Sequence, residues 1–218
     1  STLFPSTTLF RSKRVGILWG RLANEILMRQ WDMALADVAK LRDSIEAVQG
    51  VSSLQLLRMR SWLMHQAMFV FFNQQSSERS QEARNAIVDL MFQDKYMNAV
   101  QTGCPHLLRY LAVAVVTNKR RRNMLPELAR ILRQENYAHR DPVTEFVEDL
   151  VIRADIDSAR ERLQQCAEVI SNDFFLAPLA QEFVESGRLL VFESFVRVNQ
   201  RIEIGTLAQK LGMKPEVA

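Results

Sequence analysis

Apolar residues recur at helical spacing along most of the chain, and this feature constrains the fold most strongly. The first clear example follows one helix face through Ile17, Leu18, Leu22, Ile26 and Leu27. It predicts a helix over about 17–29. Folds built from many tight turns, such as sandwiches and barrels, generally need more Gly and Pro than the 7 Gly and 6 Pro present among 218 residues. The sequence therefore predicts an all-α fold.

Helix-start signals divide this pattern into pairs of helices. Asp32 is the predicted cap of a helix that ends at Gly50, and Ser52 precedes a long apolar third helix. Asp141 followed by Pro142 is typical of a helix start. Short links between successive helices predict antiparallel pairs.

A four-residue pattern occurs at two of these starts. Trp31-Asp32-Met33-Ala34 and Ile156-Asp157-Ser158-Ala159 both read as an apolar residue, a capping Asp and then a small Ala. This indicates an internal repeat, in which each helical hairpin buries its apolar face against its neighbours. The predicted architecture is a right-handed helical-hairpin solenoid of the TPR or HEAT kind.

The two ends of the chain differ from this pattern. Residues 1–12 nearly duplicate Ser-Thr-Leu-Phe without helical spacing, so 1–14 are interpreted as a disordered or non-native leader. Near the other end, 205–213 have the Leu-Ala-x-x-Leu spacing and glycine turn of a helix-turn-helix, of which the second helix would begin near Ala218. We therefore predict a helical repeat region over 15–136 and a second domain, incomplete at its C-terminus, over 137–218.

Composition and charge exclude several classes of protein. The longest apolar runs, at 67–72 and 110–116, are far shorter than the roughly 20 residues of a membrane-spanning helix. The 28 basic and 25 acidic side chains leave a net charge of +3, too small to indicate nucleic-acid binding by the whole chain. Two distant cysteines and no secretory leader favour a reducing compartment. We expect a cytoplasmic protein and leave a nuclear location open.

A helical solenoid that leads into a helix-turn-helix is the arrangement of the PCI-domain family, whose members occur in the proteasome lid, the COP9 signalosome and translation initiation factor 3. Five segments, from 18 to 204, resemble the initiation factor 3 members: LWGRLANEILMRQWDMAL, RSWLMHQAMFVFFN, YMNAVQTGCPHLLRYLAVAVVTNK, DPVTEFVEDL and NDFFLAPLAQEFVESGRLLVFESFVRVNQRIEI. The resemblance covers 15–218. The chain departs from the family by lacking the upstream helices, the second helix of the winged helix, the wing and the C-terminal tail.

The resemblance implies a non-catalytic scaffold within initiation factor 3. Such a scaffold would assemble with other subunits of the factor and bind the small ribosomal subunit. Two alternatives stay open: a PCI scaffold of the lid or signalosome, and a helix-turn-helix domain that binds nucleic acid directly. Basic and amide side chains on the second helix would favour the nucleic-acid reader.

Lys119, Arg120, Arg121 and Arg122 form the densest basic run in the chain. Guanidinium groups pair bidentately with phosphate, so the run is a candidate contact to RNA. The competing interpretation is a solvated loop between two helices, because phosphate binding usually needs several spaced contacts.

The candidate metal and catalytic residues are judged mainly by their spacing. Cys104 and His106 are potential zinc ligands, but Cys166, His65 and His139 lack the paired spacing of zinc modules. We expect Cys104 to be buried and Pro105 to start a helix. Glu145, Glu148 and Asp149 share one helix and are interpreted as an exposed acidic face. Without a nucleophile elbow, phosphate loop or zinc-protease motif, we expect no enzyme activity, cofactor or small-molecule substrate.

Aromatic residues offer one further candidate surface. Trp31, Trp62, Phe69, Phe71 and Phe72 could form a partner groove, because aromatic residues are enriched at interface hot spots. Helical spacing favours burial of Trp62 and 69–72 in the core.

Overall fold

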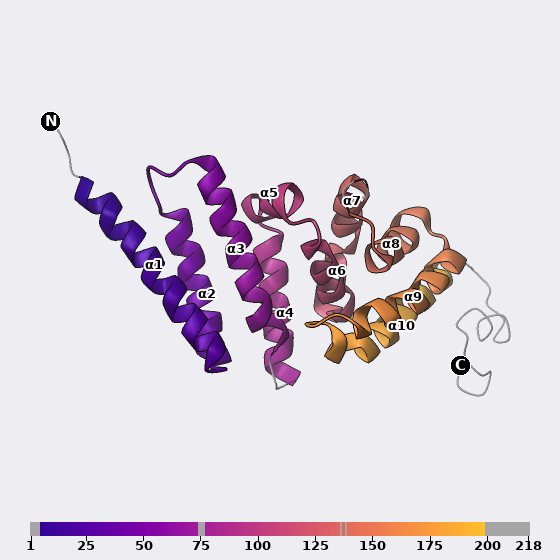
Figure 1. Cartoon of the computed structure of the whole chain (residues 1–218). Helices are drawn as coiled ribbons and strands as arrows, with labels where there is room; N and C mark the ends of the chain where they lie inside the picture. Colours follow the sequence, from indigo (N-terminus) through magenta and orange to yellow (C-terminus); the bar gives the residue numbers. More distant parts are fainter. Residues whose placement is uncertain (1–4, 74–76, 136, 138, 199–218) are drawn as a thin grey trace. The chain divides into compact units, whose positions relative to one another are not determined.

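The computed structural model describes residues 5–73, 77–135, 137 and 139–198 (Figure 1). These residues form ten α-helices with short 3₁₀ and π-helical segments, and the described part of the chain contains no strand. The all-α prediction is confirmed. The chain divides into two compact units, 1–104 and 105–218, and each is described by itself.

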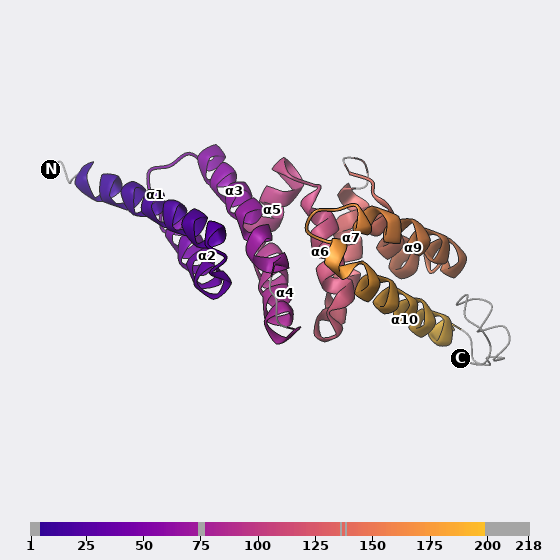
Figure 2. The same cartoon turned by 60° about the horizontal axis from the view of Figure 1, so that its bottom comes forward.

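The first unit contains five helices, of which consecutive members pack together. They are α1 (Pro5–Leu27), α2 (Trp31–Glu46), α3 (Ser53–Phe72), α4 (Ser77–Met91) and α5 (Asp94–Gly103). Figures 1 and 2 both show α1 beside α2, and α3 contacts α2, α4 and α5. Its core includes the fully buried side chains of Leu22, Leu41, Leu63, Met64, Ile87 and Tyr96.

The second unit is built around a short, almost wholly buried helix. The helix is α6 (Leu107–Thr117), which carries apolar side chains on nearly all of its sides. Such a helix is stable only when other helices surround it and bury these side chains. The elements that follow are η1 (Lys119–Met124), α7 (Leu125–Glu135), α8 (Pro142–Glu148), the π-helical turn η2 (Asp149–Arg153), α9 (Ile156–Ser171), η3 (Ala177–Leu179) and α10 (Ala180–Val198). Helices α7, α8 and α10 contact α6, while α9 packs against α8 and α10.

Several helix starts agree with the sequence signals. Ser52 caps α3, where its hydroxyl accepts a hydrogen bond from Gln55 N at 3.3 Å and Gln55 Oε1 accepts one from Ser52 N at 3.1 Å. Asp141 occupies the N-cap position of α8, and Pro142 is its first residue. At that start, Thr144 Oγ1 accepts a hydrogen bond from Asp141 N at 3.2 Å.

The capping role predicted for Asp32 and Asp157 is wrong in both cases. Helix α2 begins at Trp31 and α9 at Ile156, so each Asp lies in the first turn rather than at the cap. The reason is the preceding turn. A residue in the left-handed region, Arg29 (φ 56°) or Ala154 (φ 52°), lies two positions before each helix. Each N-cap therefore lies two residues earlier than predicted, at Gln30 and at Asp155.

The predicted repeat nevertheless has matching geometry. Ala34 and Ala159 are fully buried, and the amide of each donates to the carbonyl four residues earlier, at 2.9 Å and 3.0 Å. The amide after each left-handed residue, Gln30 N or Asp155 N, bonds back to the preceding helical segment. Two αα-hairpins therefore share one turn design, as expected in a helical-hairpin solenoid.

Other predicted boundaries differ from the structure or lie outside it. Helix α1 begins at Pro5, whereas the apolar spacing indicated a start at Ile17 and a leader over 1–14. The compact units meet at 104/105, while the domain boundary expected at 136/137 stays a prediction. The expected start of a winged helix at 205–213 lies outside the described residues. Across the described residues, no helix combines the length and apolarity needed to cross a bilayer.

Candidate functional site

The basic run forms the 3₁₀ helix η1, which connects α6 to α7. Asn118 fixes its start: the Asn118 side-chain oxygen accepts a hydrogen bond from Arg120 N at 3.2 Å, and its carbonyl accepts one from Arg121 N at 3.0 Å. Because α6 is buried and α7 packs its apolar side inward, this turn holds the basic residues at the surface of the second unit.

The four basic side chains do not share one environment. Lys119 and Arg120 are exposed, and neither forms an ion pair within the described part of the chain. Arg121 is half-buried. Arg122 is only 17% exposed and donates from Nη1 to Glu193 Oε1 of α10 at 2.5 Å. The structure therefore leaves two of the four predicted side chains accessible to a phosphate and uses Arg122 to hold α10.

Two further arginines extend the basic surface along α7. Arg130 and Arg133 are exposed and lie three residues apart, so they share one side of the helix. Neither forms an ion pair among the residues described. Arg130 and Arg133 are not contiguous with the basic run, so the run did not point to them. The exposed side of an amphipathic helix was the signal that could have found them.

The expectation of an exposed acidic face on α8 is wrong. Glu148 and Asp149 are buried, and Glu145 is half-buried. Their carboxylates are paired with arginines of the same unit: Arg153 lies 3.0 Å from Glu148 and 2.8 Å from Asp149, and Arg162 lies 3.1 Å from Glu145. Burial raises the pKa of Asp149 despite Arg153 and Arg162. The three acids have the bonding of a structural ion-pair network that joins α8 to α9.

The cysteines and histidines are separate in the fold. Cys104 is buried, as expected, with its thiol 3.5 Å from the Ala99 carbonyl. Burial raises the pKa of both the Cys104 and the Cys166 thiol, which keeps them protonated. The expectation that Pro105 starts a helix is wrong, because α6 begins at Leu107 with His106 at its N-cap. Pro105 lies in the turn before the cap, where its carbonyl accepts a hydrogen bond from Leu108 N at 3.0 Å. Within the described ranges, no three Cys, His, Asp or Glu side chains gather as metal ligands would.

The aromatic cluster is divided between core and surface. Phe71 is 2% exposed, and Phe69 and Phe72 are half-buried. Trp62 does not fit the expectation of burial, because 64% of it is exposed. Its ring lies 6.1 Å from that of Trp19 on α1, with the two planes tilted by 54°. The region of α3 around Trp62 is apolar on most sides, so helical spacing alone does not show which face is buried.

The consecutive packed helix pairs place the chain in the class of helical-repeat proteins. No family model matches the chain. It is 47% identical over 205 residues to the E subunit of eukaryotic translation initiation factor 3 from Anopheles gambiae, a match that covers 94% of this chain and 46% of that protein. The corresponding proteins of Bombyx mori and Aedes aegypti are each 46% identical, over 94% and 93% of this chain.

This identity over nearly the whole chain makes it a homologue of the E subunit of translation initiation factor 3, and the predicted resemblance is confirmed. The chain spans about half the length of the curated relatives that it matches.

Proposed function

We propose that the chain is a non-catalytic scaffold segment of translation initiation factor 3. The observation that carries this proposal is the 45–47% identity to the E subunits of that factor over about 94% of the chain. Stacked helix pairs suit such a role, because they present long side-by-side surfaces to other proteins. Its partners are other subunits of the factor and the small ribosomal subunit, and its location is the cytoplasm.

Affinity purification of the intact protein that carries this chain tests the scaffold role. The purified material is treated with nuclease, washed at moderate salt and analysed by mass spectrometry. We expect the other initiation factor 3 subunits to remain bound. Recovery of lid or signalosome subunits, or loss of all partners after nuclease treatment, would contradict the proposal and favour one of the two alternatives.

A direct contact to RNA through Lys119 and Arg120 is the second part of the proposal. Both side chains are exposed at the start of η1, and Arg130 and Arg133 continue the positive charge along α7. Spaced cations of this kind are what phosphate binding requires, since each neutralised phosphate releases counterions. Arg122 is excluded from this contact because it pairs with Glu193.

The test reverses charge at both exposed positions, with Lys119→Glu combined with Arg120→Glu. If both side chains contact phosphates, the slope of log K against log salt for ribosomal RNA falls by roughly 1.5 to 2. Arg188→Glu combined with Arg197→Glu is the matched control, because both arginines are exposed on α10 and the net charge changes equally. Equal slopes for the two double variants would remove η1 as an RNA contact.

A further inference from the structure

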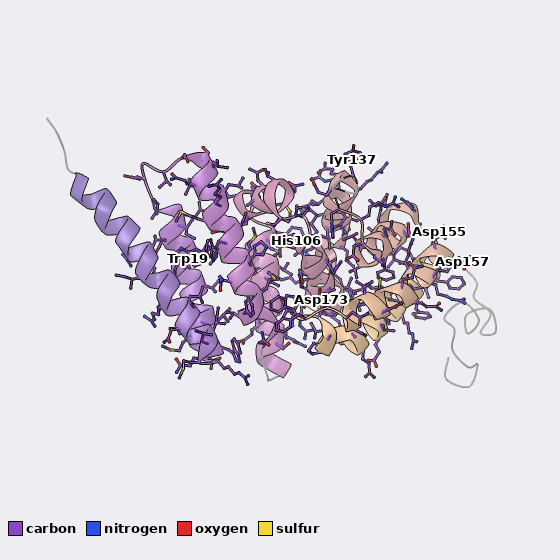
Figure 3. The ribbon with its side chains drawn as sticks, in the orientation of Figure 1. Trp19, His106, Tyr137, Asp155, Asp157 and Asp173 are labelled. Atoms are coloured by element: carbon purple, nitrogen blue, oxygen red, sulfur yellow. The ribbon has the colours of Figure 1, made fainter. Side chains whose placement is uncertain are left out.

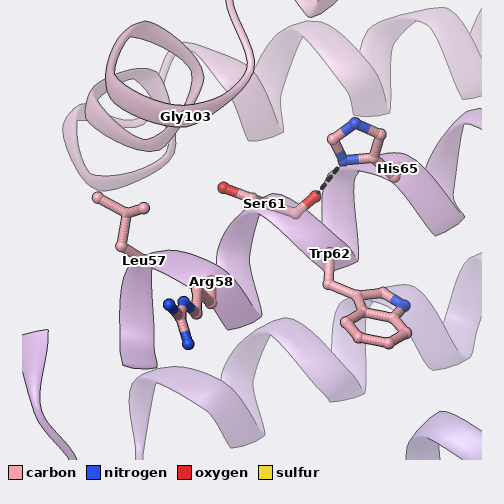
Figure 4. A pocket seen from close by; sticks show the side chains of 6 residues that line it. All are labelled: Leu57, Arg58, Ser61, Trp62, His65 and Gly103. Atoms are coloured by element: carbon pink, nitrogen blue, oxygen red, sulfur yellow. Dashed lines mark hydrogen bonds between the residues drawn. The ribbon is translucent and has the colours of Figure 1, made fainter. Parts of the chain in front are cut away.

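The surface around Trp62 contains two adjoining hollows within the first unit. One lies between α1 and α3, has a volume of about 570 Å³ and is lined by Trp19, Gly20, Ala23, Arg58, Met59, Trp62 and Gln66. The other lies between α3 and α5, measures about 460 Å³ and is lined by Leu57, Arg58, Ser61, Trp62, His65 and Gly103 (Figure 4). We call them the α1/α3 hollow and the α3/α5 hollow.

Arg58 and Trp62 belong to both hollows. They lie four residues apart on α3, so one helical turn separates them and together they form the ridge between the hollows. The two hollows are therefore parts of one surface. Tryptophan and arginine are the residue types most enriched among binding hot spots. In this surface, Trp62 and Arg58 are both exposed and lie between the two hollows.

Glycine at the edge keeps each hollow open. A Cβ added at Gly20 would meet no atom within 4 Å, and one added at Gly103 would lie 3.4 Å from Ser61 Oγ. Helical glycine costs about 1 kcal/mol relative to alanine. Packing within the unit does not require a glycine at position 20, because the space beside it is unfilled.

The charge on this surface is positive. Arg58 lines both hollows, and no acidic residue lines either of them. Arg58 is exposed, and within the described part of the chain it has no hydrogen bond or ion pair. Elsewhere in the same unit, arginines at the interfaces between helices are paired: Arg60 binds Glu46 at 2.8 Å, and Arg21 lies 2.7 Å from Asp37. The guanidinium of Arg58 thus lies between two apolar hollows with its donors available.

We propose that this surface binds an amphipathic helix of a partner protein, one that carries large apolar side chains and a carboxylate. Side chains at i and i+4 of such a helix enter the two hollows on either side of the Trp62 ridge. An Asp or Glu of the same helix accepts hydrogen bonds from Arg58. The inference rests on the proposed scaffold role and supplies it with a docking surface and a class of partner.

Photo-crosslinking in intact cells tests this proposal. Benzoylphenylalanine replaces Gln66, which lines the α1/α3 hollow, in the intact protein, and the crosslinked segment is sequenced by mass spectrometry. We expect a segment of another polypeptide with apolar residues at helical spacing and at least one carboxylate. The same reagent in place of Ala36, an exposed residue of α2 outside both hollows, is the control for random capture.

Three variants test the geometry and the charge. Gly20→Phe places a ring at the α1/α3 hollow, from a position where an added Cβ meets no atom within 4 Å. Gly16→Phe adds the same ring one turn away, at a position that lines neither hollow and where an added Cβ also meets no atom within 4 Å. Arg58→Glu reverses the charge at the ridge. We expect Gly20→Phe and Arg58→Glu to lower the crosslink yield at least about tenfold, the effect of one lost hot spot. Gly16→Phe should leave the yield unchanged.

Several outcomes would overturn the inference. The first is a crosslink yield from position 66 that does not exceed the yield from position 36. The second is a crosslink to a basic or extended segment, to a second copy or to the same polypeptide. The third is an equal loss of yield in Gly20→Phe and Gly16→Phe. The affinity purification remains separate from these results. Initiation factor 3 subunits that co-purify with every variant while the crosslink is absent would refute the docking surface alone.

Discussion

Arg122 shows how one residue of a charged run can take a structural role. Lys119 and Arg120 face solvent, while the side chain of Arg122 is 17% exposed and pairs with Glu193. Nε and Nη2 of Arg122 have no hydrogen-bond partner in the described structure. Since Glu193 is the carboxylate that offsets the charge of this largely buried group, loss of that carboxylate leaves Arg122 poorly compensated.

We predict that Glu193→Gln lowers the free energy of unfolding by about 1 to 2 kcal/mol, because a charged hydrogen bond is replaced by a neutral one. Affinity for ribosomal RNA should not change. Urea unfolding and a salt titration of RNA binding measure the two effects. Glu185→Gln, on the same helix, controls for loss of a carboxylate on α10, because Glu185 is exposed and accepts its hydrogen bond from the neutral side chain of Gln181. A weaker RNA contact with unaltered stability would contradict the structural role.

Asp155 and Asp157 make a second comparison at the scale of residues. Figure 3 shows both at the same end of α9, but only Asp155 caps the helix, since its Oδ1 accepts from Ser158 N at 3.1 Å and its Oδ2 from Ser158 Oγ at 2.8 Å. These hydrogen bonds lower the pKa of Asp155. Because the folded pKa is lowered, the Asp155 cap contributes to stability above the unfolded pKa of about 3.9. This contribution is lost as pH falls through the folded pKa.

Asp155→Ala should therefore reduce hydrogen-exchange protection in the first turn of α9 several-fold at pH 7, because the amide of Ser158 loses its acceptor. Asp157→Ala should have a smaller effect, because its carboxylate acts mainly on the helix dipole. Exchange mass spectrometry on both variants distinguishes them. If Asp157→Ala caused the larger loss, the sequence-based assignment of the cap would be correct after all.

Among helical elements, α10 has a close approach that depends on glycine. A Cβ at Gly187 would lie 2.6 Å from Leu163 Cδ1 on α9 and 3.4 Å from Phe146 Cζ on α8. Leu163 and Phe146 are buried, and Phe146 also packs against Phe183 with ring centroids 6.0 Å apart. The small residue thus sets how closely α10 packs on two other helices.

Gly187→Ala should destabilise the fold by about 1 kcal/mol net. Overpacking costs about 1 to 3 kcal/mol, which exceeds the roughly 1 kcal/mol gained when a helical glycine becomes alanine. Gly16→Ala isolates that gain, because a Cβ at Gly16 meets open space, so this variant should be up to about 1 kcal/mol more stable. Thermal unfolding checks both signs. Stabilisation by both substitutions would show that Leu163 moves aside freely.

Helical spacing and start signals anticipated many elements, including the starts of α3 and α8, because apolar periodicity and capping chemistry are local. The turns before α2 and α9 were missed because a left-handed conformation at Arg29 or Ala154 has no signal in those residue types. Trp62 was misplaced because α3 is apolar on most sides around it. The pairing of Arg122 with Glu193 spans 71 residues, and no local pattern carries it.

Across the whole molecule, the two units contain carboxylates whose pKa values shift in opposite directions. In the first unit, hydrogen bonds from Arg60 and Lys95 hold the pKa of Glu46 below its usual range, although its partial burial opposes this. In the second unit, burial raises the pKa of Asp149. Glu46 joins three helices, since Arg60 lies on α3 and Lys95 on α5.

These shifts predict opposite responses to acid. Glu46, with a depressed folded pKa, contributes stability above its unfolded pKa of about 4.3, and the contribution disappears as pH falls through the folded value. Asp149, with a raised folded pKa, contributes stability below its unfolded pKa of about 3.9, and this contribution is lost as pH rises through the folded value. Acidification therefore removes stability at α2, α3 and α5 while it relieves the charge between α8 and α9.

Glu46→Gln should lower the free energy of unfolding by about 1 to 3 kcal/mol at pH 7, because two charged hydrogen bonds from Arg60 are weakened. The difference from the unaltered chain should shrink as pH falls through the depressed folded pKa of Glu46, where Glu46 itself becomes neutral. Asp149→Asn should leave stability at pH 7 unchanged or raise it, because its partners Arg153 and Arg162 reach solvent and keep contacts to Glu148 and Glu145. Urea unfolding at several pH values, with hydrogen exchange resolved by helix, measures the stability of both variants. A deficit in the free energy of unfolding of Glu46→Gln that does not change with pH would contradict the sign assigned to Glu46. A large loss of stability in Asp149→Asn at pH 7 would contradict the sign assigned to Asp149.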